Sequence, residues 1–232
     1  MAWPRRWRWG GLAGAPVPLL AARDAYALWA DTYPPEAHNP LMVAEQAAVE
    51  PILRAASPVR ALDVGTGTGR NLQLLSEAGA RLIVGVDLSL AMLRHRAVDG
   101  RRVCGDAARL PFADAAFDLV CASLMAGDLE DVGDWLSEAA RLLAPNGHLV
   151  YSDFHPVWHV QQWRRRFRTA DGRQFEIGFH PHTIEQHLTH LARASFAVRA
   201  IREPRADGQT RPAVVVFHAV RAGRSRRPRN PA

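Results

Sequence analysis

The chain has 232 residues, of which 48% are hydrophobic and 22% charged, which is typical of one globular domain and excludes wholesale disorder, collagen and coiled coil. No apolar run approaches the roughly 18 residues that span a bilayer, so no membrane partner is expected. Eight arginines lie in residues 1–10 and 221–232, which contain no acids, and removing them from the net charge of +6 leaves −2 for residues 11–220. This nearly neutral body argues against a nucleic-acid partner.

Both ends of the chain are predicted to be disordered tails. Residues 1–18 mix Arg, Trp, Gly and Pro without periodicity, and their glycines and prolines break the apolar stretch that an export signal would need. Residues 222–232 are basic and rich in proline. The domain itself is expected to span residues 19–221. Its two cysteines, Cys104 and Cys121, lie in apolar runs with no disulfide or metal spacing, which is typical of a reducing compartment and predicts a cytoplasmic protein.

Residues 19–58 are predicted to form an N-terminal helical lid, with helices over Leu19–Ala30 and Leu41–Ala55. From residue 59 to 154, short apolar runs alternate with segments of helical period, which indicates βα units in a doubly wound parallel sheet with helices on both faces. The expected strands are Ala61–Val64, Leu82–Val86, Arg102–Cys104, Phe117–Ser123 and His148–Asp153, and the helices between them centre on Leu72–Ala78, Met92–Arg96 and Trp135–Leu143.

Beyond the fifth strand the alternation loosens, and residues 155–182 are interpreted as an insertion. It holds a predicted β-hairpin over Phe167–Ile177, turned at Asp171-Gly172, a dipeptide that tolerates the positive φ angles of such turns. The adjoining run Trp163–Arg168 is rich in arginine. We interpret this run as a solvated face, and the alternative is a docking surface for an acidic substrate or a carrier protein.

Residues 183–221 complete the predicted domain. A helix is expected to begin at Thr183, because Thr183 and Gln186 have the spacing of a capping box. Two strands, around Phe196–Ile201 and Ala213–Val220, then close the sheet as an antiparallel pair. The fold class is therefore α/β, with a mostly parallel seven-stranded sheet.

The strongest local signal is the run from Ala61 to Gly69 (ALDVGTGTG), in which an apolar strand leads directly into glycines and then a helix. Without a Cβ atom the backbone can turn tightly, and a ligand can approach its N–H groups at the positive end of the helix. Asp87 ends the next strand, where a carboxylate can accept hydrogen bonds from both hydroxyls of a ribose. Asp106 follows the third strand and can hold an exocyclic amine. These positions predict a nucleotide-like ligand.

The glycine spacing separates two classes of enzyme that share this arrangement. A dinucleotide fingerprint has the form G-x-G-x-x-G, whereas this chain has G-x-G-x-G preceded by Asp63. A carboxylate beside the loop repels a pyrophosphate but can fix an amino-acid ammonium group, directly or through water. The pattern therefore disfavours a nicotinamide dehydrogenase.

Four motifs, in this order and spacing, resemble the class I S-adenosylmethionine-dependent methyltransferases, in the small-molecule branch that includes ubiquinone/menaquinone and malonyl-carrier-protein methyltransferases. The motifs are LDVGTGTGRN, VDLSLAML, GDAARLPFADAAFDLVCASL and AARLLAPNGHLVYSDF. The resemblance runs from about Tyr26 to Asp153. It implies a Rossmann-like methyltransferase fold and S-adenosylmethionine as the cofactor.

The resemblance also implies which residues contact the cofactor. Those expected around its methionine part are Asp63, Gly65, Thr66, Gly67 and Gly69. Asp87 would take the ribose hydroxyls, and the expected adenine contacts are Leu88 and Met92 on its faces with Asp106 and Ala107 at its edge. Ser123 and Leu124 would face the sulfonium. Tyr26 and Tyr33 match an aromatic pattern that packs over the cofactor in relatives.

Methyl transfer from a sulfonium is an in-line displacement, for which orientation in a dry pocket supplies much of the rate. A hydroxyl acceptor also benefits from a base, whereas an ionised carboxylate needs none. His155 is the first candidate, because it follows the fifth strand, and His38 in the lid loop is the second. A histidine that merely packs or caps is the alternative for each. Asp128 is interpreted as a solvated loop acid or a residue facing substrate.

His159, His180 and His182 are further candidates to line the pocket, but the histidine spacings match no recognised metal-ligand set and no metal is predicted. The sequence thus predicts an S-adenosylmethionine-dependent methyltransferase that acts on a small molecule, at oxygen. One alternative acceptor is an acyl group on a carrier protein. The other alternative is a protein that binds the cofactor without transferring methyl.

Overall fold

The computed structural model describes residues 17–94 and 100–223; the predicted tails lie mostly outside this part, as does Arg96 of one expected helix. Its main sheet has seven strands in the order β4-β3-β2-β5-β6-β10-β9. The first five are parallel, and β10 pairs antiparallel with both β6 and β9. The strands are β2 (Arg60–Val64), β3 (Leu82–Asp87), β4 (Arg101–Cys104), β5 (Phe117–Ala122), β6 (Leu143–Phe154), β9 (Phe196–Arg202) and β10 (Val214–Arg221). The predicted fold class is confirmed.

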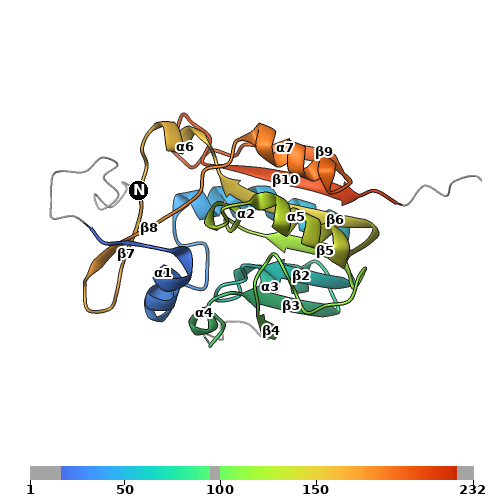
Figure 1. The fold of residues 1–232 in the computed structure, drawn as a ribbon, viewed down its shortest axis with the longest axis horizontal. Coiled ribbons are helices and arrows are strands. Elements are labelled where there is room, and N and C mark those ends of the chain that lie inside the picture. Colours follow the sequence, from blue (N-terminus) through green and yellow to red (C-terminus); the bar gives the residue numbers. More distant parts are fainter. Residues whose placement is uncertain (1–16, 95–99, 224–232) are drawn as a thin grey trace, which may run out of the picture.

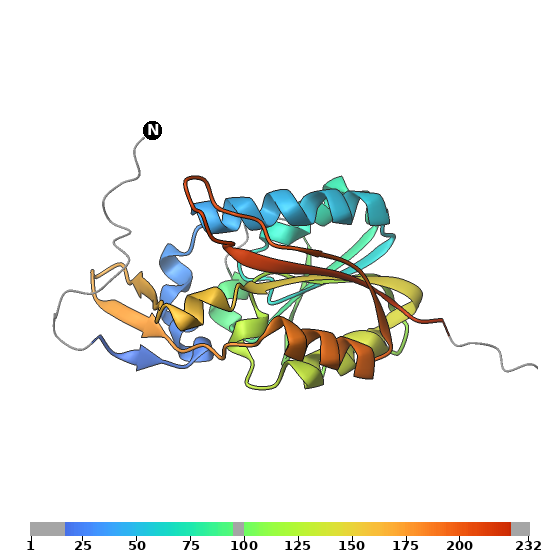
Figure 2. The same cartoon turned by 90° about the horizontal axis from the view of Figure 1, so that it is seen from above.

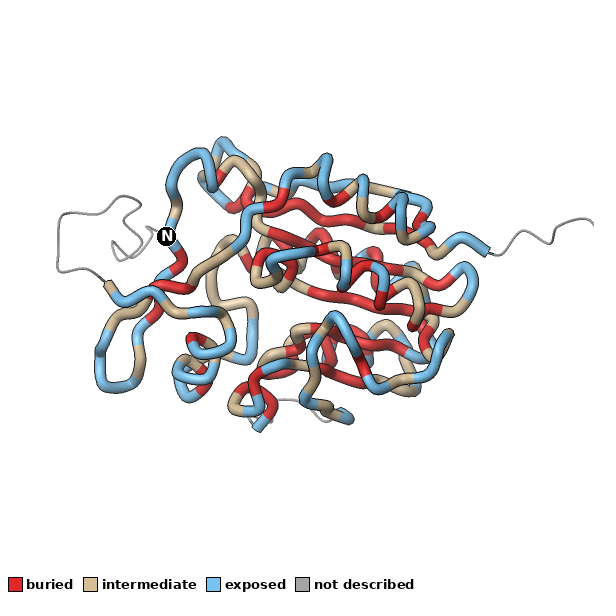
Figure 3. The backbone as a smooth tube through the Cα atoms, in the orientation of Figure 1, coloured by how far each residue is buried: buried red, intermediate tan, exposed pale blue. Residues whose placement is uncertain are grey.

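Helices cover both faces of this sheet (Figure 2). On one face lie α2 (Pro40–Ala56) and α3 (Arg70–Glu77), and on the other lie α5 (Val132–Leu142) and α7 (Ile184–Arg193). Successive residues of a strand point to opposite faces, so Val216 packs under α2 while Phe217 packs under α7. The central strands read as largely apolar runs because both of their faces are buried, as Figure 3 shows, whereas the edge strands β4 and β9 are partly exposed.

Local signals in the sequence set the ends of two helices that matter for the site. Asn39 caps α2, where its Oδ1 accepts from the backbone N of Met42 at 2.9 Å. The capping box predicted for α7 is present: the backbone N of Gln186 donates to Thr183 Oγ1 at 3.1 Å, and its side chain accepts from the backbone N of Thr183.

The lid differs from the sequence prediction at its first residues. Leu19–Leu20 form a short strand, β1, instead of the start of a helix, and pair in parallel with β8 (Gln174–Ile177). The helix α1 begins only at Ala22 and runs to Trp29, followed by the 3₁₀ turn η1 (Ala30–Thr32). One edge of β8 pairs with β7, and the backbone groups of its other edge pair with β1, more than 150 residues earlier in the chain. Hydrophobic periodicity is a local property of the sequence and cannot predict pairing over such a separation.

The predicted hairpin is confirmed as β7 (Arg165–Arg168) and β8, which pair antiparallel. With β1 it makes a separate three-stranded sheet beside α1. This small sheet lies at the left of Figure 1, and the C-terminal ends of α5 and α7 lie at the right. A small core of its own, which includes Ala25, Phe167 and Ile177, joins this sheet to α1. Among the described residues, no helix is long and apolar enough to cross a membrane.

Candidate functional site

The loop after β2 has the backbone geometry that its glycines predict. Gly65, Gly67 and Gly69 have φ angles of +70°, +55° and +106°. Residues other than glycine rarely adopt such positive φ angles. At position 65 space is also limiting, because a Cβ there would lie 2.7 Å from Met125 Cγ. The loop borders an open hollow of about 340 Å³, whose lining residues are Tyr33, Pro34, Glu36, Met42, Gly65–Thr68, Arg70, Asn71 and Ser123.

Asp87 reaches this loop from the end of the neighbouring strand, β3. Its Oδ2 accepts from the backbone N of Gly67 and its Oδ1 from the backbone N of Ser89, each at 2.8 Å. Burial raises the pKa of Asp87, and the two N–H donors oppose the shift. A carboxylate oxygen has a second lone pair, so each oxygen can still accept from a hydroxyl.

Asp63 lies behind the loop and does not line the hollow. It is fully buried, its Oδ1 accepts from Asn71 Nδ2 at 2.9 Å, and burial raises its pKa. Asn71 instead faces the hollow, and its buried Oδ1 has no hydrogen-bond partner among the described residues. The geometry therefore presents Asn71, oriented by Asp63, where the sequence analysis expected the carboxylate itself.

Glu45 on α2 is a buried residue that the sequence analysis missed. Its Oε2 pairs with Arg70 at 2.9 Å, and its Oε1 accepts from the hydroxyls of Ser123 and Ser152 at 2.7 and 2.9 Å. It is 0% exposed. The network joins α2, α3, β5 and β6 below the hollow. The sequence does contain a signal for this burial: Glu45 lies three residues after Met42 and therefore on the apolar face of α2, where a charged residue is unusual.

Aromatic side chains of the lid stand over the hollow. The ring of Tyr33, which lines it, packs edge-on against Trp29, Tyr26 and His38, with centroid distances of 4.8, 6.3 and 5.4 Å. Burial raises the pKa of both tyrosines. His38 Nδ1 lies 3.3 Å from the carbonyl oxygen of Glu36. Burial lowers the pKa of His38, which favours the neutral form of its ring.

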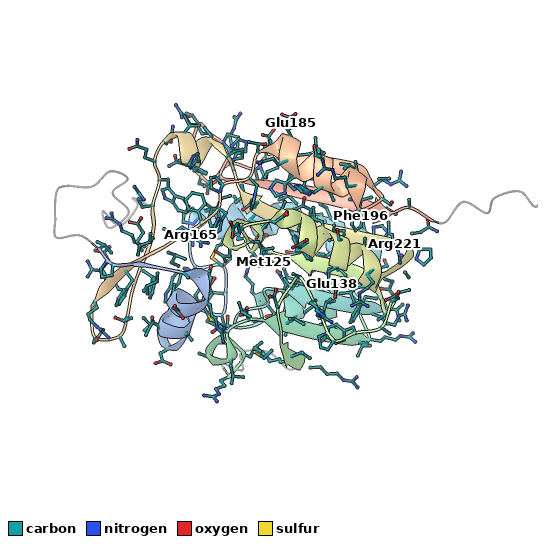
Figure 4. The ribbon with its side chains drawn as sticks, viewed as in Figure 1. Met125, Glu138, Arg165, Glu185, Phe196 and Arg221 are labelled. Atoms are coloured by element: carbon teal, nitrogen blue, oxygen red, sulfur yellow. The ribbon has the colours of Figure 1, made fainter. Side chains whose placement is uncertain are left out.

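The arginine run does not form the uniform solvated face expected from the sequence. Arg165 on β7 is only 7% exposed and forms an ion pair with Asp128 of η2 (Ala126–Asp128). Its guanidinium also lies 5.2 Å from the centre of the Phe154 ring. The side chain of Asp128 is only 12% exposed rather than solvated, and its partial burial raises its pKa. Figure 4 places Arg165 and Met125 at the same end of the sheet.

The remaining expected cofactor contacts are spread along the carboxyl ends of β3, β4 and β5. Leu88 is 45% exposed, whereas Met92 on α4 (Leu90–Arg94) is buried in the core. Asp106 Oδ1 accepts from the backbone N of Ala108 at 3.0 Å and so stabilises the local turn, and Ala107 packs against the core. Leu124 has a φ of +57° and donates its backbone N to Ser152.

His155 is held away from this hollow. Its Nε2 lies 2.7 Å from Glu203 Oε1, and its Nδ1 accepts from the backbone N of Val157 at 3.2 Å. Both ring nitrogens are therefore engaged. It lines a second hollow of about 200 Å³ together with Asp153, Phe154, Pro156, His159, Phe179, His180, Pro181 and His182. Within the described ranges, no three His, Cys, Asp or Glu side chains are grouped to hold a metal ion.

The chain is similar in sequence and in fold to known methyltransferases. Residues 62–151 match a family model described as a methyltransferase domain. The chain is 41% identical over 98 residues to the demethylmenaquinone methyltransferase of Corynebacterium kroppenstedtii, and 38% identical over 103 residues to that of Renibacterium salmoninarum. These matches cover 41% and 43% of this chain and 42% and 43% of the relatives, so the chain matches less than half of their length.

Solved structures match over more of the chain. A crystal structure of an S-adenosylmethionine-dependent methyltransferase from Mesorhizobium loti has a TM-score of 0.61 at 26% identity and covers 77% of this chain and all of that one. The magnesium protoporphyrin IX methyltransferase of Synechocystis, solved with bound S-adenosylmethionine, has a TM-score of 0.57 at 19% identity over 78% of this chain and 81% of its own. At 19% identity, the similarity to the Synechocystis enzyme is evidence for a shared fold and not for a shared substrate.

Proposed function

Because the chain contains a methyltransferase domain and has the fold of the class I S-adenosylmethionine-dependent methyltransferases, we propose that it transfers a methyl group from S-adenosylmethionine to a hydroxyl oxygen of a small molecule. The resemblance identified from the four sequence motifs is confirmed for the domain and the fold. The curated relatives are named for demethylmenaquinone, which supports a small molecule as the acceptor. The free thiols Cys104 and Cys121 support a reducing compartment, the cytoplasm.

One observation carries the cofactor assignment: the carboxylate of Asp87 bridges from β3 to the N–H of Gly67 at the edge of the hollow. A ribose placed there meets two acceptor oxygens, and the methionine end meets the glycine loop. The unpartnered Oδ1 of Asn71 suits an ammonium group in the same hollow. The donors and acceptors of these residues therefore fit S-adenosylmethionine.

The bound cofactor supplies a sulfonium methyl group that an acceptor oxygen can displace in line. The protein's part is to orient the acceptor and to exclude water, which can contribute several orders of magnitude. Ser123 lines the hollow at the end of β5, and Tyr33 covers it from the lid. His38 lies beside Tyr33 and is a candidate to take the hydroxyl proton, since burial favours the neutral ring that can accept it. The contacts of His155 match the capping alternative, because no ring nitrogen remains to accept a substrate proton.

The test mixes the purified full chain with S-adenosylmethionine and a panel of phenols, reduced naphthoquinones and carboxylic acids. We expect S-adenosylhomocysteine to form when the acceptor carries a hydroxyl group. Mass spectrometry measures the release, and NMR of the product distinguishes an O-methyl from a C-methyl group. A C-methylated product would contradict the oxygen assignment. Cofactor binding by calorimetry, with no turnover for any acceptor, would instead support the alternative of a protein that binds without transferring methyl.

Arg164 and Arg166 offer a test of the carrier-protein alternative. Both pair with Glu176, at 3.0 and 3.2 Å, which weakens their use as a free basic surface. We expect the double variant Arg164→Gln, Arg166→Gln to keep its activity on small acceptors within about twofold, since both arginine side chains are exposed and neither lines the first hollow. Activity on carrier-linked acyl groups that disappears in this variant would favour the carrier instead. Arg165 is left unchanged because it is buried.

A further inference from the structure

Two consecutive residues at the start of α3 bring a cation and a hydrogen-bond acceptor to the first hollow, which the glycine loop borders. Arg70 and Asn71 both line it, and among the described residues that do so Arg70 is the only cationic one. The side chain of Arg70 is 12% exposed, and Asn71 is 4% exposed. An α-amino acid carries a carboxylate and an ammonium group on one carbon atom, so it requires such a pair of neighbouring partners.

The orientation of the Asn71 amide follows from its hydrogen bonds. Its Nδ2 donates to Asp63 Oδ1 at 2.9 Å and to Ser123 Oγ at 3.1 Å. A carboxylate only accepts, so the amide nitrogen faces Asp63 and the carbonyl oxygen points away from it. That oxygen has no partner among the described residues. A buried acceptor without a partner is costly, so a ligand that supplies an ammonium donor would be stabilised there.

Arg70 has donors left over after its contacts with the protein. Its Nη1 donates to Glu45 Oε2 at 2.9 Å and to Gln46 Oε1 at 3.3 Å. Within residues 17–94 and 100–223, Nε and Nη2 have no acceptor. A guanidinium is a planar fork of five N–H groups whose spacing matches the two oxygens of a carboxylate. Arg70 can therefore bind a carboxylate while it stays paired with Glu45.

Glu45 of the lid helix α2 holds both of these groups. Its Oε2 accepts from Arg70, and its Oε1 accepts from Ser123 Oγ at 2.7 Å, the same hydroxyl that accepts from Asn71. The directions agree, because the single hydrogen of the hydroxyl goes to the carboxylate and its lone pairs remain for the amide. The two helices lie on the same face of the sheet (Figure 2). One fully buried carboxylate thus fixes the cation and the acceptor together.

We propose that the first hollow binds the amino-acid end of the cofactor through its two charges, the carboxylate at Arg70 and the ammonium group at Asn71, and that Glu45 is the positioning residue for this pair. This inference rests on the proposed function. Neither Arg70 nor Glu45 is among the cofactor contacts that the sequence motifs imply. Arg70 and Glu45 neutralise each other, and the amino-acid end of the cofactor is itself neutral overall, so its binding leaves no uncompensated charge in the hollow.

The first test compares three ligands by isothermal titration calorimetry with the full chain: S-adenosylhomocysteine, its decarboxylated analogue and its analogue without the amino group. The wild type should bind S-adenosylhomocysteine about 10- to 100-fold more tightly than either analogue, the range for one lost hydrogen bond to a charged group. Arg70→Gln should lose the preference over the decarboxylated analogue and keep the preference over the analogue without the amino group. Asn71→Ala should show the reverse pattern.

This crossed pattern separates recognition from folding, because a variant that is merely destabilised would bind all three ligands more weakly by the same factor. The matched control is Arg54→Gln on α2, whose exposed ion pairs with Glu50 and Glu77 lie outside the lining of the hollow, and it should keep both preferences. A wild-type preference for the carboxylate in Arg70→Gln would overturn the assignment. The same result with a raised KM for acidic acceptors would place Arg70 at the acceptor instead.

The second test addresses Glu45, which is expected to touch no ligand atom. Glu45→Gln keeps the size of the side chain but not both acceptor oxygens, so both preferences should fall by at least about threefold, as expected for the loss of one well-placed hydrogen bond. A thermal melt reports whether the variant is folded. If it is not, Ser123→Ala removes only the link to Asn71 and should lower the preference for the amino group alone. Folded Glu45→Gln or Ser123→Ala with wild-type preferences would refute the positioning role.

The two proposals fail in different ways. Wild-type protein that binds neither S-adenosylmethionine nor S-adenosylhomocysteine would contradict the proposed function itself. Wild-type protein that binds both, but binds S-adenosylhomocysteine no more tightly than the two analogues, would contradict only the recognition of the amino-acid end by Arg70 and Asn71.

Discussion

Replacing Asp87 with alanine should weaken S-adenosylmethionine binding by about 2–3 kcal/mol, or roughly 30- to 150-fold, the range for hydrogen bonds to a charged group. The substitution removes the expected acceptor for the ribose hydroxyls and also releases the N–H groups of Gly67 and Ser89. Isothermal titration calorimetry with the purified full chain measures the change. An unchanged dissociation constant would remove the ribose role from Asp87.

Two controls separate binding from folding in this experiment. Asp87→Asn keeps one acceptor oxygen and should lose less affinity than Asp87→Ala, while a thermal melt reports whether either variant is unfolded. The pH dependence has a defined sign. Burial raises the pKa of Asp87, so the wild-type affinity should decline as the pH falls through that raised pKa.

Replacing Glu45 with alanine should lower the free energy of unfolding by about 3–5 kcal/mol, as expected when one partner of a buried ion pair is removed. Arg70 would lose its carboxylate, and the hydroxyls of Ser123 and Ser152 would lose a common acceptor. Urea unfolding measures the change. The matched control is Glu50→Ala on the same helix, whose ion pair with Arg54 is exposed and should cost at most about 1 kcal/mol. Equal losses in the two variants would contradict the importance of burial.

Local sequence signals were sufficient for most of the fold. The main sheet is recognisable because its central strands are apolar on both faces. The glycines after Val64 favour a tight turn with positive φ angles. The start of α7 follows from two residues, Thr183 and Gln186, that satisfy each other's backbone groups. Each of these features depends on neighbours within a few positions of the chain.

The features that sequence reasoning missed depend on partners that are far apart in the chain. Arg165 reads as one member of an exposed run until Asp128, 37 residues earlier, is placed beside it. Glu45 reads as a helix residue until its hydrogen bonds to Ser123 and Ser152 are seen. A side chain's charge is visible in a sequence, but the partner that permits its burial is set by the packing of distant elements.

The short strand β1 has a practical bearing on how the protein is handled. Its attachment to the hairpin includes two backbone hydrogen bonds, from Glu176 N to the oxygen of Pro18 and from Gly178 N to that of Leu20, both 2.9 Å long. A shortened protein that starts at Ala22 would lack both, and α1 would keep only its side-chain packing. Removing these residues to aid crystallisation would therefore weaken the attachment of the lid that covers the first hollow. Truncation sites are better placed before Val17.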